Sequence, residues 1–545
     1  MRPAPIALLL AVVVAQAPSA SAYVALMAGQ EARPLNGTFN KVPVLHSNQP
    51  EEVEGPGILI NTAPGSAMAE TGVWLRNAEY TFNGEFGVHM HHKYLPPYRR
   101  QIAPGSRRTE LTLGLIFINP GNKPVRIQFQ KGAVRNSFEA PYLAENLMGV
   151  KPLGPRPWNT GPGDATAVQM LRGRLDSRLN DAITLPPRSR VVLFQKPVPA
   201  LGIANALLKG RSDGPFQMAV VAASNPNSDA DIVAVLDSGR LAPGRVYLRR
   251  IAEINNRQIF SRVGGVAIGD SYQAQLKHDL NRQGPLHVPF TSTNRHHFGT
   301  REVQVNPLAT RMLDSSLDNV GTYGVRFDVD LNLVGNGPYE LVMSHPVPAG
   351  GLRPFTAFRG SMQVRTDDGL QEMHVGLRSG QSVALTTLNL KPGVVNPVRV
   401  SMVYPADATP GHLLSVVPAS QLARVQSNAE RVELARLNQA RPSRPVAPAP
   451  PATIGVAPVQ AAPVSRRPMA PPPAVTPEIG AAALLPPSEL PYQPPIRPMG
   501  TAPLQPQRSP VSPRATKSPV AVQLFERYQQ ALEAQQQQLR QQQQR

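Results

Sequence analysis

Short apolar windows separated by glycine, proline and asparagine run through the chain from Gly37 to Pro418. The windows are rich in Val, Ile, Leu, Phe and Thr, and residues 125–130 alternate between apolar and polar side chains. Such alternation is typical of strands that have one buried and one solvated face. Many short strands with turns between them predict stacked β-sandwiches. We therefore expect a mainly β fold, made of one β-sandwich domain or of two related ones.

Local patterns predict individual elements within this region. Residues 111–118 and 125–130 flank the turn sequence Asn119-Pro120-Gly121-Asn122, which predicts a β-hairpin. The best helical window is 165–179, where apolar residues recur every three or four positions. Further strand windows lie at 190–194, 217–223, 232–236, 325–333, 339–343, 382–388 and 398–403.

A weak internal echo links two parts of the β region. Residues 191–200 (VVLFQKPVPA) resemble residues 341–350 (LVMSHPVPAG). This echo favours a duplicated sandwich, although a strand followed by Pro-Val-Pro is also ordinary loop chemistry. We expect a first β-rich unit over 37–245 and a second over 246–418.

The N-terminus has the features of a secretory signal peptide over residues 1–22. Arg2 precedes an apolar run from Ile6 to Ala15, and Ala20-Ser21-Ala22 forms a small-residue cleavage site. Residues 23–36 are expected to be a loosely ordered lead. No later stretch approaches the roughly 20 apolar residues that a transmembrane helix needs. We therefore expect export to the periplasm, the cell surface or the extracellular medium.

The composition changes after the β region. A helix is expected over 419–440, because Ser420 is a suitable N-cap and Pro442 follows the end. Residues 441–517 predict a disordered Pro-rich linker, since 23 prolines fall within 441–520. Residues 518–545 form a Gln-rich tail with a thin apolar seam. That tail is either a short helix for docking or self-association, or a disordered segment.

Cysteine content and charge limit the protein's stabilisation and its partners. The chain has no cysteine, so an exported form must be held together by core burial without disulfides. The formal net charge of +19 favours anionic partners such as acidic polysaccharide or wall polymers, or simply supports solubility. Lys and Arg are dispersed along the chain, and export argues against nucleic acid as a partner.

The densest candidate for metal chemistry is His89-Met90-His91-His92. Alternate residues of a strand share a face, so His89 and His91 could bind one divalent metal, with His92 as a neighbour. A second pair, His296-His297, has Glu302 nearby in sequence. The alternative is that these histidines are packed polar residues, and no cofactor is expected on that interpretation.

Two further groups of residues have both a functional and a structural interpretation. Tyr94, Tyr98, Arg99 and Arg100 could stack on sugar rings and bind anions, or could form a basic loop packed on prolines. Asp328 and Asp330 lie two residues apart on one expected strand, where a solvated edge is the alternative to a glycosidase carboxylate pair. The chain lacks a phosphate-binding Gly-rich loop.

Several dispersed segments resemble an uncharacterised family of secreted cyanobacterial proteins, classed as a domain of unknown function. The segments that carry the resemblance are 42–51, 57–60, 82–86 leading to His91-His92, 212–215, 299–300 and, most distinctively, 321–331 (GTYGVRFDVDL). The resemblance spans roughly residues 37–405 and omits the Pro-rich extension. It implies an exported protein and supplies no activity and no catalytic residues.

These observations favour an exported, non-enzymatic protein of the cell envelope or cell surface. Its sandwich body would bind an anionic wall or surface polysaccharide, or another envelope protein. One alternative is a secreted metal-dependent or polysaccharide-processing enzyme that uses His89, His91 and His92. The other is a soluble carbohydrate-binding module, which the low aromatic content of 5% disfavours.

Overall fold

The computed structural model describes residues 32–98, 102, 110–143, 148–154, 160–257, 262–346, 355–406 and 408–423, and the backbone of 23–24. Strands make up 52% and helices 10% of it, which confirms the mainly β fold. The expected signal peptide, most of the expected helix over 419–440, the linker and the tail lie outside the described residues. Residues 419–423 are helical. Within the described part of the chain, no helix is both long and apolar enough to cross a membrane.

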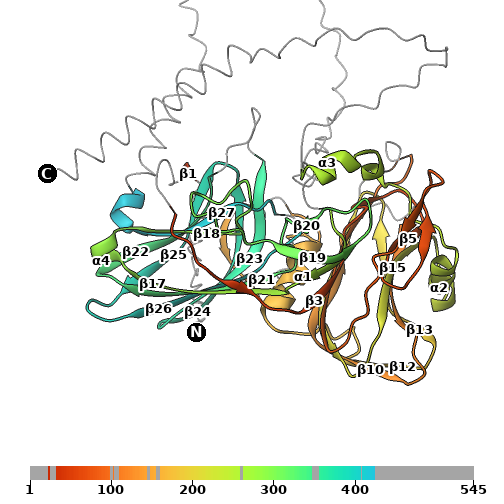
Figure 1. The fold of residues 1–545 in the computed structure, drawn as a ribbon. Coiled ribbons are helices and arrows are strands. Elements are labelled where there is room, and N and C mark those ends of the chain that lie inside the picture. The colour runs from red at the N-terminus through yellow and green to blue at the C-terminus, as the bar shows by residue number, and fades with distance from the viewer. Residues whose placement is uncertain are drawn as a thin grey trace, which may run out of the picture.

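The first sandwich packs a nine-stranded sheet against a four-stranded sheet (Figure 1). The larger sheet has the order β12 (Ala182–Leu185), β10 (Val125–Asn136), β14 (Ile203–Ser212), β8 (Glu85–Tyr94), β3 (Pro43–Ser47), β16 (Gly264–Ile268), β19 (Asn306–Arg311) and β20 (Asp318–Asn319), with β4 (Glu52–Val53) beside β8. The smaller sheet has the order β13 (Ser189–Pro199), β9 (Glu110–Asn119), β15 (Gln217–Ala223) and β5 (Gly57–Asn61). Inward side chains such as Phe86, Ile127, Leu115 and Val220 join the two sheets in one core.

The second sandwich packs a seven-stranded sheet against a five-stranded sheet. The larger sheet has the order β11 (Gly149–Pro152), β24 (Gly369–Arg378), β23 (Thr356–Thr366), β26 (Asn396–Val403), β21 (Arg326–Val334), β17 (Ser271–Asp279) and β2 (Thr38–Phe39). The smaller sheet has the order β1 (Tyr23–Val24), β25 (Gln381–Leu390), β22 (Gly337–His345), β27 (His412–Pro418) and β18 (Leu286–Phe290). A second core lies between them and includes Leu331, Val400, Leu341 and Leu414.

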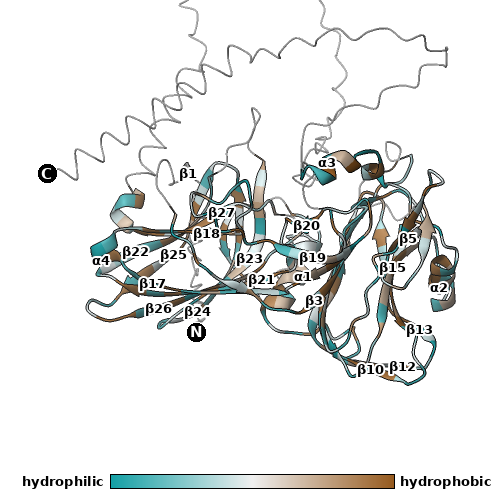
Figure 2. Ribbon diagram, in the orientation of Figure 1, coloured by the Kyte–Doolittle hydropathy of each residue, from teal (hydrophilic) through white to brown (hydrophobic). Residues whose placement is uncertain are grey.

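Core burial stabilises both sandwiches without any disulfide. Along β21 the side chains alternate strictly between buried and partly exposed, as the period-two pattern predicts. Figure 2 shows the same mixture of hydrophobic and hydrophilic positions along strands of both sandwiches. Each fully buried Val, Leu, Ile or Phe side chain contributes roughly 1.5–3 kcal/mol.

The two sandwiches repeat one topology over nine strands. In chain order, β3, β5, β8, β9, β10, β12, β13, β14 and β15 correspond to β17, β18, β21, β22, β23, β24, β25, β26 and β27. Every pairing in the first set recurs in the second with the same direction. In particular, the parallel pair β3–β8 matches the parallel pair β17–β21. The fold is therefore a duplicated sandwich.

The sequence echo does not identify this duplication, because it aligns strands that are not equivalent. Residues 191–200 fall largely in β13, whereas residues 341–345 belong to β22. The strand of the second repeat that is equivalent to β13 is β25, and the strand of the first repeat that is equivalent to β22 is β9. The similarity of the two segments reflects apolar strand composition followed by proline.

The repeats exchange their leading strands. β2, which precedes β3, pairs with β17 of the second repeat, and β16, which precedes β17, pairs with β3 of the first repeat. Where the two segments cross, Asn40 and Asp270 bond to each other twice, through Asn40 Nδ2 to Asp270 Oδ1 (2.6 Å) and Asp270 N to Asn40 Oδ1 (2.9 Å). Strands from both sides of residue 245 thus share sheets. The expected boundary between 245 and 246 stays a prediction.

Two local predictions are wrong in instructive ways. Residues 111–118 and 125–130 form β9 and β10 as expected, but the strands lie in opposite sheets and make no hairpin. Residues 232–236, expected as a strand, lie in helix α2 (Asp229–Asp237). Ser228 caps that helix in a reciprocal capping box with Asp231, a signal that is present in the sequence.

Helix α1 (Pro162–Leu171) lies between the two larger sheets (Figure 1). It contacts β10 and β14 on one side and β23 and β26 on the other. The helix ends earlier than the expected 165–179, because Gly173 has a φ of +66° and turns the chain away. The short helices α3 (Ile251–Asn255) and α4 (Leu280–Gln283), the 3₁₀ turn η3 (Val246–Arg249) and the hairpin β6 (Ser66–Met68) with β7 (Trp74–Arg76) lie around the sheets.

A fully buried ion pair fixes the chain near the exchanged strands. Arg245 Nη1 lies 3.0 Å from Asp314 Oδ2, and the two side chains are 1% and 0% exposed. Gln49 Nε2 also donates to Asp314, and Arg245 Nη2 donates to the Leu59 carbonyl. Removing one member of such a pair leaves an uncompensated charge in the interior.

We expect Asp314→Asn to lower the free energy of unfolding by about 3–5 kcal/mol, because Arg245 would keep its charge without a counterion. Chemical denaturation measures this change. Asp330→Asn is the matched control: its partner Arg399 is half exposed, so the loss should be about 1 kcal/mol or less. Equal losses in the two variants would contradict the assigned difference between the pairs.

Candidate functional site

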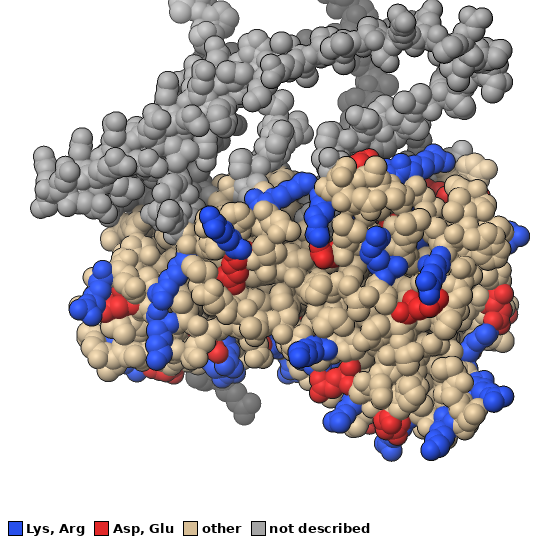
Figure 3. Space-filling model, viewed as in Figure 1, with Lys and Arg blue, Asp and Glu red and all other residues tan. Residues whose placement is uncertain are grey.

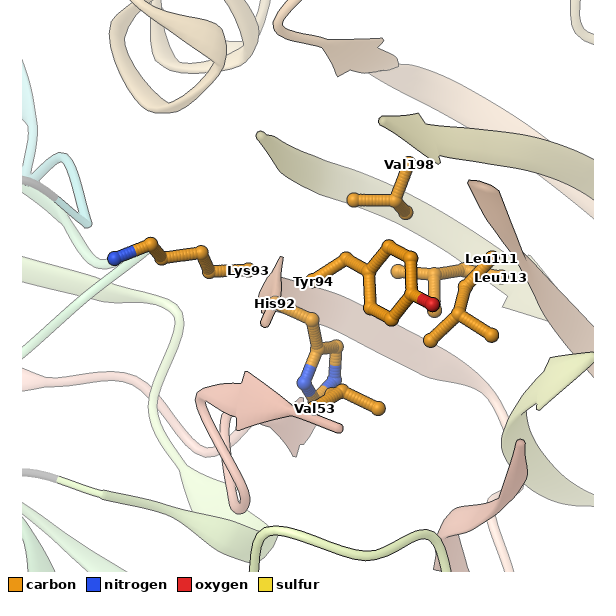
Figure 4. A pocket seen from close by; sticks show the side chains of 7 residues that line it. All are labelled: Val53, His92, Lys93, Tyr94, Leu111, Leu113 and Val198. Carbon is orange, nitrogen blue, oxygen red and sulfur yellow. The ribbon is translucent and has the colours of Figure 1, made fainter. Parts of the chain in front are cut away.

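The predicted histidines lie on β8, at the junction between the sandwiches, and they point to opposite sides of its sheet. His89 and His91 face the second sandwich: the His89 ring lies 6.1 Å from that of Tyr323, and His91 Nδ1 lies 2.9 Å from Asn205 Oδ1. His92 faces the first core, where Figure 4 shows it on the same side of the strand as Tyr94 while Lys93 extends away. Strand alternation therefore separates His92 from the other two.

Each imidazole has a structural partner. His92 Nδ1 donates to the Pro50 carbonyl (2.7 Å), which fixes its tautomer, and Nε2 accepts from the Ser47 hydroxyl (2.8 Å). His89 shares an Nδ1-to-Nδ1 hydrogen bond of 3.1 Å with His46 of β3, so one ring donates and the other accepts. His46 is the close neighbour that the sequence analysis did not identify. It stands at 1% exposure on a strand far from β8 in sequence.

Burial keeps these rings neutral. It lowers the pKa of His46 and of His92 to about 3. The pKa of His89 is also well below its ordinary value, first because of burial and then because of the neighbouring His46. Neutral imidazoles that are hydrogen-bonded in a protein interior help to specify how the surrounding strands pack.

The predicted metal site does not assemble. Within the described residues, no three histidine or carboxylate side chains converge as metal ligands would. His296 and His297 are not brought to β8, and Glu302 accepts hydrogen bonds from the Tyr272 hydroxyl and from the Leu35 amide (2.6 Å). His89 is hydrogen-bonded to His46, and not to His91 or His92.

The two described members of the predicted glycan-binding set, Tyr94 and Tyr98, do not share a surface. Tyr94 is 8% exposed and packs with Leu111, Leu113 and Val198 around a hollow with no space for a water molecule (Figure 4). Burial raises the pKa of its hydroxyl. Tyr98 is 74% exposed, and Arg99 and Arg100 lie outside the described residues. Tyr94 is therefore a core residue, and Tyr98 is the exposed ring of the set.

Asp328 and Asp330 are neutralised by arginines on the outer face of the second sandwich. Arg326 Nε lies 2.7 Å from Asp328, and Arg399 Nε lies 2.6 Å from Asp330. Burial acts to raise the pKa of Asp328, but hydrogen bonds from Arg326 and Ser401 outweigh it and the pKa is lowered. A carboxyl group held ionised in this way is a poor general acid.

Helix α1 carries a buried polar network into the junction. Asp164 Oδ2 accepts from Thr160 (2.6 Å) and Ser361 (3.1 Å) and lies 3.1 Å from His374 Nδ1. Two residues later, Thr166 Oγ1 accepts from Asn205 Nδ2, which places β14 against the helix. These contacts join both sandwiches to one helix. No sequence pattern indicates them, since the residues are scattered from 160 to 374.

Aromatic and imidazole rings follow one another from the junction into the second core. In order they are His46, His89, Tyr323, Tyr404, His412 and His345, with successive ring centroids 5.1 to 6.1 Å apart. Gly324 allows this segment to approach Leu207 of the first repeat closely, because a Cβ at position 324 would lie 2.9 Å from Leu207 Cδ2. Its φ of +76° also favours glycine. Residues 321–331 thus contribute to the contact between the two sandwiches.

The buried histidines predict an acid-sensitive fold. Below pH 6.5 the unfolded chain binds protons at His46 and His92 that the folded chain, with pKa values of about 3, does not bind. Stability present above pH 6.5 is therefore lost as the pH falls toward 3, by roughly 1.4 kcal/mol per pH unit for each such histidine.

We expect His92→Gln to reduce this slope by about one proton's contribution between about pH 6.5 and 4.5. Urea unfolding at several pH values measures the free energy of unfolding of both proteins. If the slope were unchanged in the variant, His92 would bind protons equally in the folded and the unfolded chain, which would contradict the effect of its burial.

Comparison with known proteins gives a family and no activity. The family model described as "Protein of unknown function (DUF3370)" matches residues 30–418. No curated protein matches. Solved structures of three single-substitution variants of the Bacillus subtilis oxalate decarboxylase are 8–10% identical and cover 65–70% of this chain and 78–80% of theirs. Their TM-scores of 0.08 carry no structural argument.

The matched segment begins just before β2 and ends with β27, so it contains both sandwiches and the helix between them. The chain belongs to the DUF3370 family of proteins of unknown function.

Proposed function

We propose that this protein is an exported, non-enzymatic component of the cell envelope or cell surface that binds anionic envelope polymers through its sandwich body. Export is supported by the signal-peptide pattern of residues 1–22. It is also consistent with β1, which begins at Tyr23, the residue after the expected cleavage site, and pairs with β25.

The observation that carries the non-enzymatic role is that the most reactive side chains are bonded into the interior. His46, His89 and His92 are buried and neutral, and their mutual or backbone hydrogen bonds are structural. Asp328 and Asp330 are held by arginines. A general acid or base needs a pKa near the working pH and access to substrate, and these groups support packing instead.

Charge supports an anionic ligand. The formal net charge of the whole chain is +19, and Figure 3 shows Lys and Arg spread over the visible face of both sandwiches, with Asp and Glu among them. A dispersed basic surface attracts a polyanion at long range without requiring one deep pocket. Repeating uronate or sulfate groups of a surface polysaccharide match this distribution better than a single small ligand.

Binding to an acidic polysaccharide tests the ligand. We expect the protein to sediment with polygalacturonate beads at low salt and to be released as NaCl rises from about 50 to 300 mM, since screening shortens the range of surface charges to below about 10 Å. Neutral dextran beads are the control. Equal retention on both matrices, or none on either, would contradict the proposal.

Fractionation of the native cells tests the address and the extension. We expect the full-length protein in the wall or outer-membrane fraction, and a version truncated after Pro442 to be less enriched there, because the spacer and tail would no longer tether it. N-terminal sequencing of the recovered protein should begin at Tyr23. A freely soluble protein in both forms would contradict the tether.

A further inference from the structure

A half-buried group of three cations lies between strands of the two sandwiches, at the C-terminal end of α1. We call it the junction cation cluster: Lys131 of β10, Lys209 of β14 and Arg326 of β21. Arg326 Nη1 donates to the Leu171 carbonyl (3.2 Å), which places it at the last turn of the helix. The cluster thus combines residues from both repeats.

The two lysines stand directly opposite each other. Lys131 pairs with Lys209 in the β10–β14 register, immediately after a bulge at Phe129. On the same strands Val134 and Leu208 point into the first core, so the lysines, with odd-numbered neighbours such as Leu207, point toward the second sandwich. Like charges in directly opposed positions destabilise a sheet.

Three carboxylates lie around the three cations, but among the described residues none of them is bonded to Lys131. Lys209 pairs with Asp270 at 2.9 Å and more loosely with Glu85 at 3.5 Å, and Arg326 pairs with Asp328 at 2.7 Å. Lys131 has no hydrogen bond or ion pair with the residues that the structure describes. Burial, followed by the charges of Arg326 and Lys209, lowers the pKa of Lys131. The charges of Asp270 and Asp328 act in the opposite direction, but neither carboxylate is bonded to Lys131. A half-buried ammonium without a bonded counterion is costly, and an arriving oxyanion would lower that cost.

A strip of polar side chains leads away from the cluster along the outer face of the second sandwich. The parallel register sets Ser271, Gln273, Gln275 and Lys277 of β17 beside Arg326, Asp328, Asp330 and Asn332 of β21. Gln273, Gln275 and Lys277 are exposed. Alternate residues of a strand are roughly 6.8 Å apart, so donors and acceptors recur at a regular interval. An extended chain of hydroxyl-rich units could follow this strip with one charged group at the cluster.

We propose that the junction cation cluster binds one carboxylate or sulfate group of an acidic polysaccharide, with Lys131 as the residue that contacts it. The neighbouring strip hydrogen-bonds the sugar units that follow. This inference rests on the proposed function and names the site at which the polymer is recognised. Lys209 and Arg326 remain bound to their carboxylates and add attraction, while Lys131 gains a counterion in direct contact.

The test compares binding of the full-length mature chain and its variants to oligogalacturonate by titration calorimetry. We expect Lys131→Gln to weaken binding at least about tenfold, the size of one charged hydrogen bond. Lys131→Arg should retain most of the affinity. Lys123→Gln removes the same charge from an exposed turn and should change the affinity less than about twofold, as expected for a screened surface charge. A sulfated oligosaccharide and inorganic phosphate, as separate titrants, distinguish the source of the oxyanion.

The outcomes separate the site from the function. If the wild-type protein binds no acidic oligosaccharide, the proposed function fails. If it binds and Lys131→Gln behaves like Lys123→Gln, the polymer is recognised elsewhere and the site is wrong. Phosphate that binds as tightly as the oligosaccharides would contradict polymer recognition. Lys131→Gln should also melt no lower than wild type, because it removes an unpaired cation, and loss of its fold would make Lys131 a structural residue.

Discussion

The structure depends on one constraint: polar groups that enter the junction between the sandwiches leave water and must find partners there. Asp164 Oδ2, with its three contacts, and the Thr166–Asn205–His91 chain supply such partners on the two sides of α1. An unpartnered polar group in such a layer costs about 1–3 kcal/mol. The bonds therefore specify how the repeats dock, because a shifted arrangement would leave several groups unpaired. Apolar packing of Leu207, Met170 and Val403 fills the remaining space.

The same layer explains why, within the described residues, the histidine-rich strand does not bring three ligand side chains to one point. A ligand must keep a lone pair available and converge with others on one point. Here His46 and His89 are hydrogen-bonded to each other through their Nδ1 atoms, and the Nε2 lone pair of His92, on the opposite side of the sheet, accepts from the Ser47 hydroxyl. Where the layer opens at the end of α1, the balance changes. There Lys131 is retained beside two cations, Lys209 and Arg326, whose own carboxylate partners are already engaged.

Sequence patterns predicted the positions of many strands correctly, but they did not predict which strands pair with each other. The windows at 217–223 and 398–403 lie within β15 and β26, because one-face burial imposes a local period of two. Pairing is set by the whole sheet, so the segments around Asn119 were joined wrongly into a hairpin. Asn119 bonds across to the carbonyls of Leu185 and Pro186 and directs the chain to the opposite sheet. For the site, strand alternation correctly placed His89 and His91 together. His46 and Lys131 could not be found, since they become neighbours of their partners only through long-range pairing.

Because β2 and β16 are exchanged between the repeats, this single polypeptide has the connectivity of a symmetric, strand-swapped dimer. Each repeat completes the edge of the other, so neither sandwich is a contiguous piece of sequence. A fragment ending before Gly264 would carry an open β3 edge and a β2 strand with no acceptor. Unpaired edges and free strands recruit the complementary ones from another copy. Cutting the gene at its midpoint would therefore be expected to yield a swapped assembly of half-chains, and a single isolated sandwich would be the least stable product.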